Sequence, residues 1–178
     1  MYITTESEAS AIFMEWNKSE FGETGNQLIL PLFEGSEKAP NNALSGLSRS
    51  QRSLVREAIA SDDFEGKKGQ RMAVWTPGCR VLLVGMGKKD EFDHRKARNI
   101  GARVIAALSK KNGLGLTVRF TSGWSSERML DFAEGMMLRD YEFLEHQRID
   151  DEHITEPWSA DFQASARHQD ALADGLSR

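Results

Sequence analysis

The stretch from Cys79 to Asp93, C-R-V-L-L-V-G-M-G-K-K-D-E-F-D, decides the fold of this chain. Its apolar run, Val81 to Val84, is short, begins and ends with a β-branched residue and is followed by glycine, which is typical of a strand buried on both faces. Gly85 and Gly87 then interrupt the strand, and a helical pattern begins near His94. This order predicts the central unit of an α/β domain. Glycines at the carboxyl end of such a strand often face a ligand, so this pair is the first candidate site.

Length and composition set the broad class. The 178 residues suit one domain with a short appendage. No apolar run approaches the roughly 20 residues that span a bilayer, so we expect no membrane contact. The N-terminus carries acidic residues and has no apolar signal segment, and the one cysteine, Cys79, is compatible with a reducing compartment. We therefore expect a cytoplasmic protein.

The first half of the chain predicts a strand-rich arrangement. Strands are expected over 27–33, 71–76 and 80–84, and Pro77-Gly78 predicts that the last two form a hairpin. Pro31 indicates a strand end, an edge or a bulge in the first of them. A helix is expected from Ser48, which can cap it, as can Ser50. Two further short elements are expected over 1–4, as an edge strand, and over 11–16.

The second half predicts alternating helices and strands. Asp93 is a natural N-cap for a helix that Asn112-Gly113 would end, and a strand is expected over 116–120. A second helix is expected from Ser125, followed by a short strand over 141–144. From Glu145 the composition is that of an exposed linker, and 159–178 has a helical pattern that stops in mid-course, which suggests a fragment.

The glycine pair lacks the rest of a dinucleotide fingerprint. That fingerprint requires a small residue three positions after Gly87, where Asp90 stands, and a carboxylate there would repel a pyrophosphate. Lys88-Lys89 likewise lacks the glycine spacing and the following Ser or Thr of a phosphate-binding loop. A tight turn is the simpler interpretation of Gly85 and Gly87, and a ligand site remains the alternative.

Other chemistry has little support in the sequence. His146 and His153, with Asp150 to Glu152 between them, could gather as metal ligands, but they lie in the stretch most typical of a linker. Cys79 has no partner cysteine and no evident activating histidine. The basic runs Lys88-Lys89 and Arg95-Lys96-Arg98 fit solvated faces or a weak nucleic-acid surface, and the net charge of −4 favours the former. The sequence predicts an α/β domain without an evident catalytic set.

Several segments together resemble the N-terminal domain of the leucyl aminopeptidase family, the cytosol aminopeptidases. The resemblance covers roughly residues 25–145. It is carried, in the family's order, by L-I-L-P-L-F-E-G (28–35), D-F-E-G-K-K-G-Q (63–70), R-V-L-L-V-G-M-G-K-K (80–89), R-K-A-R-N-I-G-A (95–102) and F-A-E-G-M-M-L-R-D-Y-E-F (132–143).

The resemblance implies a three-layer α/β/α sandwich with a mixed sheet, similar to macro domains, followed by a C-terminal linker helix. Residues 1–145 would form this domain, and 146–178 the linker and the start of an interdomain helix that leads to an absent catalytic domain. In the family, that downstream domain holds two divalent metals, zinc, manganese or magnesium, and the catalytic motif N-T-D-A-E-G-R. No catalytic or metal residue is therefore expected in this chain.

The leading functional hypothesis is a non-catalytic structural, assembly or regulatory domain of a leucyl aminopeptidase, which in this family forms hexamers. One alternative is a macro-like module that binds ADP-ribose or a nucleotide at Gly85 and Gly87. Another is a nucleic-acid-binding accessory domain, since some bacterial family members bind DNA. These alternatives stay open at the level of sequence.

Overall fold

The computed structural model describes residues 13–15, 26–35, 40–108, 115–146 and 159–176 of the chain. These residues form six strands and four helices. In chain order they are β1 (Phe13–Glu15), β2 (Gln27–Leu32), α1 (Arg49–Ser61), β3 (Arg71–Thr76), β4 (Cys79–Gly85), α2 (His94–Leu108), β5 (Gly115–Arg119), α3 (Ser126–His146), β6 (Ser159–Gln163) and α4 (Ala166–Leu176).

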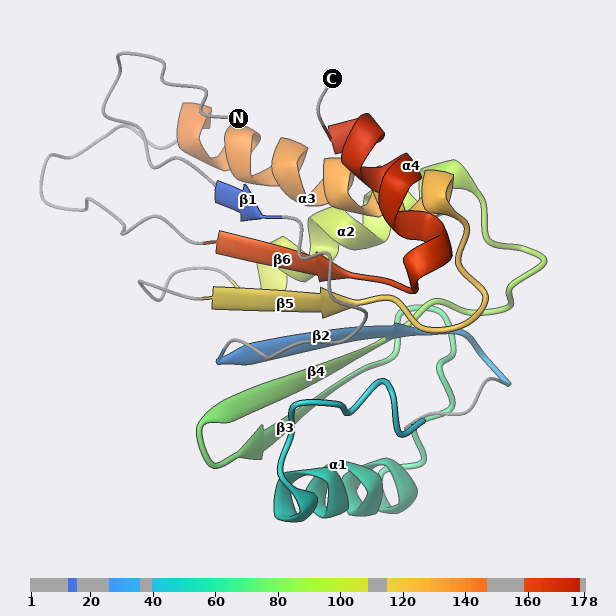
Figure 1. The fold of residues 1–178 in the computed structure, drawn as a ribbon, viewed down its shortest axis with the longest axis vertical. Coiled ribbons are helices and arrows are strands. Elements are labelled where there is room, and N and C mark those ends of the chain that lie inside the picture. The colour runs from blue at the N-terminus through green and yellow to red at the C-terminus, as the bar shows by residue number, and fades with distance from the viewer. Residues whose placement is uncertain (1–12, 16–25, 36–39, 109–114, 147–158, 177–178) are drawn as a thin grey trace, which may run out of the picture.

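The strands form one mixed sheet in the order β1-β6-β5-β2-β4-β3 (Figure 1). Neighbouring strands are parallel except β3 and β4, which form the expected antiparallel hairpin. The α/β class with a mixed sheet is thus confirmed. The expectation for Pro31 also holds, because β5 pairs with β2 only at residues 27–29, so Pro31 lies beyond the end of that ladder.

Helices cover both faces of the sheet. Alternate residues of β2 point to opposite faces: Leu28 and Leu30 belong to a buried cluster with Val55 of α1, whereas Ile29 belongs to a larger cluster with α2 and α3. Figure 1 shows α1 at the β3 end of the sheet and α2, α3 and α4 on the side of β5 and β6. The apolar runs in β2 and β4 predict strands that are buried on both faces. Such strands need helices on both faces of the sheet, as the structure shows.

Side-chain caps fix where two helices begin. The Ser48 hydroxyl accepts from the Gln51 amide at 3.3 Å while the Gln51 side chain accepts from the Ser48 amide at 2.7 Å, a complete capping box. Asp93 caps α2, as predicted, by accepting from the Lys96 amide at 2.8 Å. That hydrogen bond is the main reason why the pKa of Asp93 lies below its ordinary value.

Two predicted elements are wrong in type. Residues 141–144 are not a strand but part of α3, which continues to His146 because no Gly or Pro interrupts the sequence after Gly135. The helical pattern predicted over 159–178 is confirmed from Ala166 to Leu176, as α4, but Ser159–Gln163 forms β6 instead. This strand lies between β1 and β5, so the sheet includes residues beyond the boundary expected at residue 145. The expected edge strand over 1–4 and helix end at Asn112-Gly113 lie outside the described residues.

Candidate functional site

The glycine pair at the end of β4 contacts the chain's own preceding loop. The Gly85 amide donates to the Gln70 carbonyl at 2.7 Å, and the Gly87 amide donates to the Gly66 carbonyl at 2.9 Å. Between them, the Met86 amide donates to the Leu32 carbonyl at 2.9 Å. All three backbone donors that could have cradled an anion are therefore used within the fold.

The same loop fills the space in front of the glycines. A Cβ atom on Gly85 would lie 2.0 Å from the Lys67 carbonyl oxygen, and one on Gly87 would lie 3.0 Å from Lys68 Cβ. Gly87 also has a φ of +78°, which favours glycine. The glycines thus allow close approach of a loop, in agreement with the tight-turn interpretation.

Gln70 organises this loop, a role that sequence reasoning missed. Its Oε1 accepts from the amides of Glu65, Gly66 and Lys67 at 3.0, 3.0 and 3.2 Å. Its Nε2 donates to the Asp63 carbonyl at 3.1 Å. One side chain therefore satisfies the backbone of a whole turn, and the recurrent glycines of D-F-E-G-K-K-G-Q were the only signal of it in the sequence.

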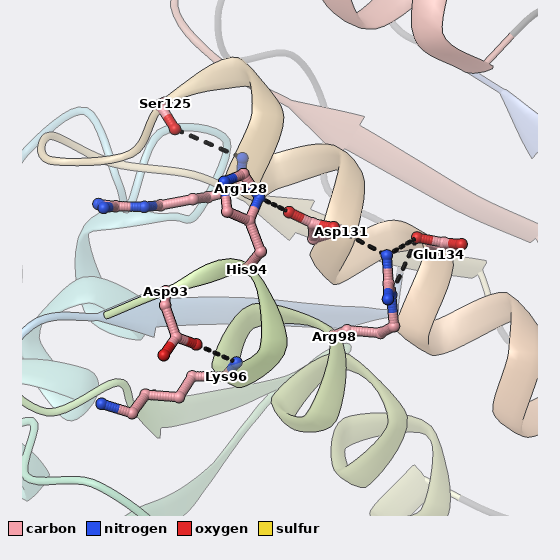
Figure 2. A network of polar contacts seen from close by, with 8 residues as sticks. All are labelled: Asp93, His94, Lys96, Arg98, Ser125, Arg128, Asp131 and Glu134. Atoms are coloured by element: carbon pink, nitrogen blue, oxygen red, sulfur yellow. Dashed lines mark hydrogen bonds and ion pairs between the residues drawn. The ribbon is translucent and has the colours of Figure 1, made fainter. Parts of the chain in front are cut away.

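A polar network joins α2 to α3 (Figure 2). One carboxylate oxygen of Asp131, on α3, is hydrogen-bonded to His94 Nδ1. The other accepts a hydrogen bond from Arg98 Nη2 at 3.1 Å. Arg98 also donates to Glu134 through Nη2 at 2.6 Å and Nε at 3.0 Å. The Asp131 side chain is only 12% exposed. The network therefore lies at the border of the contact between α2 and α3.

Small residues allow that helix contact to be close. A Cβ atom on Gly101 of α2 would lie 2.0 Å from the Phe132 carbonyl oxygen, and one on Gly135 of α3 would lie 1.9 Å from the Arg98 carbonyl oxygen.

The basic run Arg95-Lys96-Arg98 is partly engaged within the fold, because Arg98 is paired with Glu134 of α3 and Lys96 Nζ contacts the Glu91 carbonyl.

Arg119 is a buried charge at the end of β5, and sequence reasoning also missed it. Its side chain is fully buried in β5 and donates to Gln163 Oε1 from Nε at 2.9 Å and from Nη2 at 2.6 Å. Nη1 donates to the carbonyls of Ala43 and Ser45 at 2.9 and 2.7 Å. Burial lowers the pKa of Arg119 from its ordinary value to about 10, and the nearby Asp161 charge opposes that shift. The guanidinium stays protonated at neutral pH and ties β5, β6 and the loop before α1 together.

A serine and a histidine meet where α4 packs on α3. Ser126 Oγ lies 2.8 Å from His168 Nδ1, and Arg167 Nε lies 3.0 Å from His168 Nε2. Arginine can only donate, so Nε2 must accept, and the proton of the neutral ring stands on Nδ1. His168 then donates to the serine, whereas activation of a nucleophile requires an imidazole that accepts its proton. The pair fixes α4 in place and does not form a catalytic dyad.

The remaining candidates from the sequence do not come together within the described residues. Cys79 is buried, with Sγ 3.8 Å from the Arg80 carbonyl oxygen. No group of three His, Cys, Asp or Glu side chains there is placed to hold a metal ion. The predicted cluster of Asp150 to His153 lies outside that part of the chain. No helix in the described ranges is both long and apolar enough to cross a membrane.

The comparison with protein families settles the relationship. A model described as the cytosol aminopeptidase family, N-terminal domain, matches residues 29–148. The chain belongs to the cytosol aminopeptidase family. Its curated relatives include a probable cytosol aminopeptidase of Wolbachia pipientis wMel, 28% identical over 131 residues, or 72% of this chain and 24% of that protein. Another, from Rippkaea orientalis, is 28% identical over 132 residues, or 71% of this chain and 25% of that protein.

Two solved structures have a fold similar to that of this chain. A mutant of tomato leucine aminopeptidase matches 97% of this chain and 37% of its own, with a TM-score of 0.67 and 22% identity. The bottromycin maturation enzyme BotP in complex with Mn matches 85% of this chain and 29% of its own, with a TM-score of 0.52 and 19% identity. At these identities the likeness shows the fold alone. The chain spans about a quarter of the length of the curated cytosol aminopeptidases that it matches.

Proposed function

We propose that this chain is the non-catalytic N-terminal domain of a leucyl aminopeptidase and serves structure, assembly or regulation. The observation that carries the proposal is the family match, which is to the N-terminal domain, together with the coverage of only about a quarter of each relative. The remaining length would supply a catalytic domain. Two divalent metals there, zinc, manganese or magnesium, would activate a water and polarise the scissile carbonyl.

The polar chemistry of the described residues supports this role. Arg119 and Gln70 are used to hold strands and loops, and Arg98 and Asp131 are used to join α2 to α3. His168 donates to Ser126 instead of activating it. Each of these groups holds neighbouring elements of the described fold together.

Further features belong to the same proposal. The layered arrangement would be macro-domain-like, and α4 would begin the helix that leads to the catalytic domain, anchored on α3 through His168 and Ser126. The parent protein would be cytoplasmic and would assemble as a hexamer. A nucleotide site at Gly85 and Gly87 is not favoured, because the chain's own loop contacts those glycines. A nucleic-acid surface at Lys88-Lys89 and Arg95-Lys96-Arg98 is not favoured either, because Arg98 pairs with Glu134 and Lys96 contacts the Glu91 carbonyl.

The test is hydrolysis of a leucyl amide by the purified chain in the presence of manganese, zinc or magnesium. We expect no turnover above the buffer, while a full-length cytosol aminopeptidase of the family turns over in the same assay. Turnover that is proportional to the concentration of this chain, and that copurifies with it, would contradict the proposal.

A further inference from the structure

We propose that two copies of this chain associate through β3, which pairs edge to edge and antiparallel with β3 of the second copy. β3 is the outermost strand of the described sheet and lies at its end next to α1 (Figure 1). This pairing does not depend on the non-catalytic role proposed above, because the oligomeric state tests the pairing and leucyl hydrolysis tests the role.

The register of the hairpin determines which backbone groups of β3 point outward. In an antiparallel pair, alternate opposing residues exchange both hydrogen bonds. Gly85 donates to Gln70, so the bonded positions of this hairpin are Gln70, Met72, Val74 and Thr76. The N–H and C=O groups of the intervening residues are directed away from β4. These residues are Arg71, Ala73 and Trp75, and all three are exposed.

This set of outward groups is complementary to itself. A two-fold axis at Ala73 places Ala73 opposite Ala73 of the second copy and Arg71 opposite Trp75 of the second copy. All of these positions carry outward-directed donors and acceptors, so both members of each pair can exchange two hydrogen bonds. A shift of the register by one residue would set outward groups against inward ones.

The side chains match in the same register. Trp75 is 74% exposed, and Arg80, its cross-strand partner, already places its guanidinium carbon 4.9 Å from the indole centroid. Arg80 lies beside Trp75 on the β4 side of the strand. Arg71 of the second copy would lie beside the same indole on the outer side of the strand and make a second cation–π contact. The contact that the hairpin makes within one chain would thus be repeated between chains, which favours a second copy over an unrelated extended segment.

The strand itself lacks three features that keep sheet edges apart. Natural edge strands commonly carry an inward charge, a proline or a bulge. R-M-A-V-W-T has its one charge at the end, contains no proline and pairs residue by residue with β4. Of the four large apolar side chains that are exposed in the described residues, Trp75 lies on this strand and Leu54 on α1 next to it. Pairing would remove such surface from water.

The first measurement is the oligomeric state of the 178-residue chain by sedimentation, over concentrations up to about 1 mM, the range of weak association. We expect a reversible monomer–dimer equilibrium. Ala73→Pro should abolish the dimer, because it removes an outward N–H that the β3–β4 ladder does not use. Ala73→Lys, which keeps the N–H but adds an edge charge, should weaken the dimer at least tenfold. Leu138→Lys, an exposed substitution on α3, is the matched control and should leave it unchanged.

A crosslink tests the register. Residues opposite each other at a bonded position have Cα atoms about 5.5 Å apart, within disulfide range. Ala73→Cys should therefore form a covalent dimer under mild oxidation, whereas the natural chain should not, since Cys79 is 6% exposed. Met137→Cys, exposed on α3, serves as the control thiol and should remain monomeric.

Three results would overturn the proposal. The first is a chain that stays monomeric throughout the concentration range. The second is a dimer that persists in Ala73→Pro or Ala73→Lys, with the fold of the variant verified by circular dichroism. The third is a monomer whose β3 edge takes up an extended peptide of another sequence but not a second copy. None of these results alters the expected absence of leucyl hydrolysis.

Discussion

At the scale of single residues, Gly85 and Arg119 show how the chain uses its polar and backbone groups to hold the fold together. Gly85 stands where a ligand could approach a strand end, yet the Lys67 carbonyl occupies that space. Arg119 stands in an apolar strand, yet four of its hydrogen bonds hold neighbouring segments. Both residues therefore contribute mainly to stability, and the effect of substituting them should be measured as a change in the free energy of unfolding.

Gly85→Ala should lower the free energy of unfolding by about 3 kcal/mol, the upper end of the usual cost of overpacking. The new methyl group would collide with the Lys67 backbone, which cannot rotate away as a side chain would. Gly78→Ala is the matched control, because Gly78 has a φ of +78° but open space around it. It should cost only about 1 kcal/mol. Chemical denaturation measures both, and equal costs would contradict the close contact of loop and strand.

Arg119→Met should also lower the free energy of unfolding by about 3 kcal/mol, because it leaves the Ala43 and Ser45 carbonyl oxygens without their donor. It also removes the positive charge near Asp161. Arg119→Lys should not restore stability, since one ammonium cannot reach both Gln163 and the Ala43 carbonyl in the guanidinium's fork geometry. Arg103→Met, exposed on α2, should change stability by less than about 0.5 kcal/mol. A neutral effect of Arg119→Met in the same denaturation series would refute the structural role of the buried charge.

At the scale of elements, the α2–α3 pair and the docking of α4 set the geometry of one side of the sheet. Gly101 and Gly135 bring the helices together, and the Asp131 network borders the contact. His168 then connects α4 to the first turn of α3. The helix contact at Gly101 and the docking contact at His168 each give a prediction.

Gly101→Ala should destabilise the fold by roughly 1–3 kcal/mol, although alanine in a helix is normally better than glycine by about 1 kcal/mol. The reason is the Phe132 carbonyl oxygen, which a Cβ atom would meet at 2.0 Å. Ala107→Gly, exposed on the same helix, reports propensity alone and should cost about 1 kcal/mol. Thermal denaturation that finds Gly101→Ala more stable than the natural chain would contradict the close helix packing.

The docking of α4 should weaken in acid. Burial, with a smaller contribution from the Arg167 charge, lowers the pKa of His168 below its ordinary value of 6.5. The unfolded chain therefore takes up the proton first, and the stability due to neutral His168 is complete above pH 6.5 and lost as pH falls below it. We expect the free energy of unfolding to fall more steeply between about pH 7.5 and 5 in the natural chain than in His168→Gln, whose side chain does not titrate. Parallel slopes would show that His168 does not contribute to the pH dependence.

The elements also show what the sequence could and could not predict. Both caps, Ser48 and Asp93, the central strands and the hairpin were predictable because local chemistry alone specifies them. Ser159–Gln163 was not, because its strand form depends on pairing with β1 and β5, which lie far away in the chain. The roles of Gln70 and Arg119 were hidden for the same reason. Their partners are backbone groups or distant side chains, and no spacing rule identifies them.

At the scale of the whole molecule, the family match and the mixed α/β sheet agree with the resemblance that the sequence shows to the N-terminal domain of leucyl aminopeptidases. The match to the N-terminal domain covers residues 29–148, and the mixed sheet continues to β6 beyond that range. We propose that the chain is an accessory domain of a longer aminopeptidase, and that a catalytic domain makes up the rest of the parent protein.

The most direct test of that claim is to sequence the coding DNA beyond the codon for Arg178. We predict an uninterrupted reading frame that continues the α4 helix and then encodes a catalytic domain with an N-T-D-A-E-G-R segment and a full set of metal ligands. A stop codon directly after Arg178 would contradict the account, because the domain would then act alone and its role within an aminopeptidase would fail.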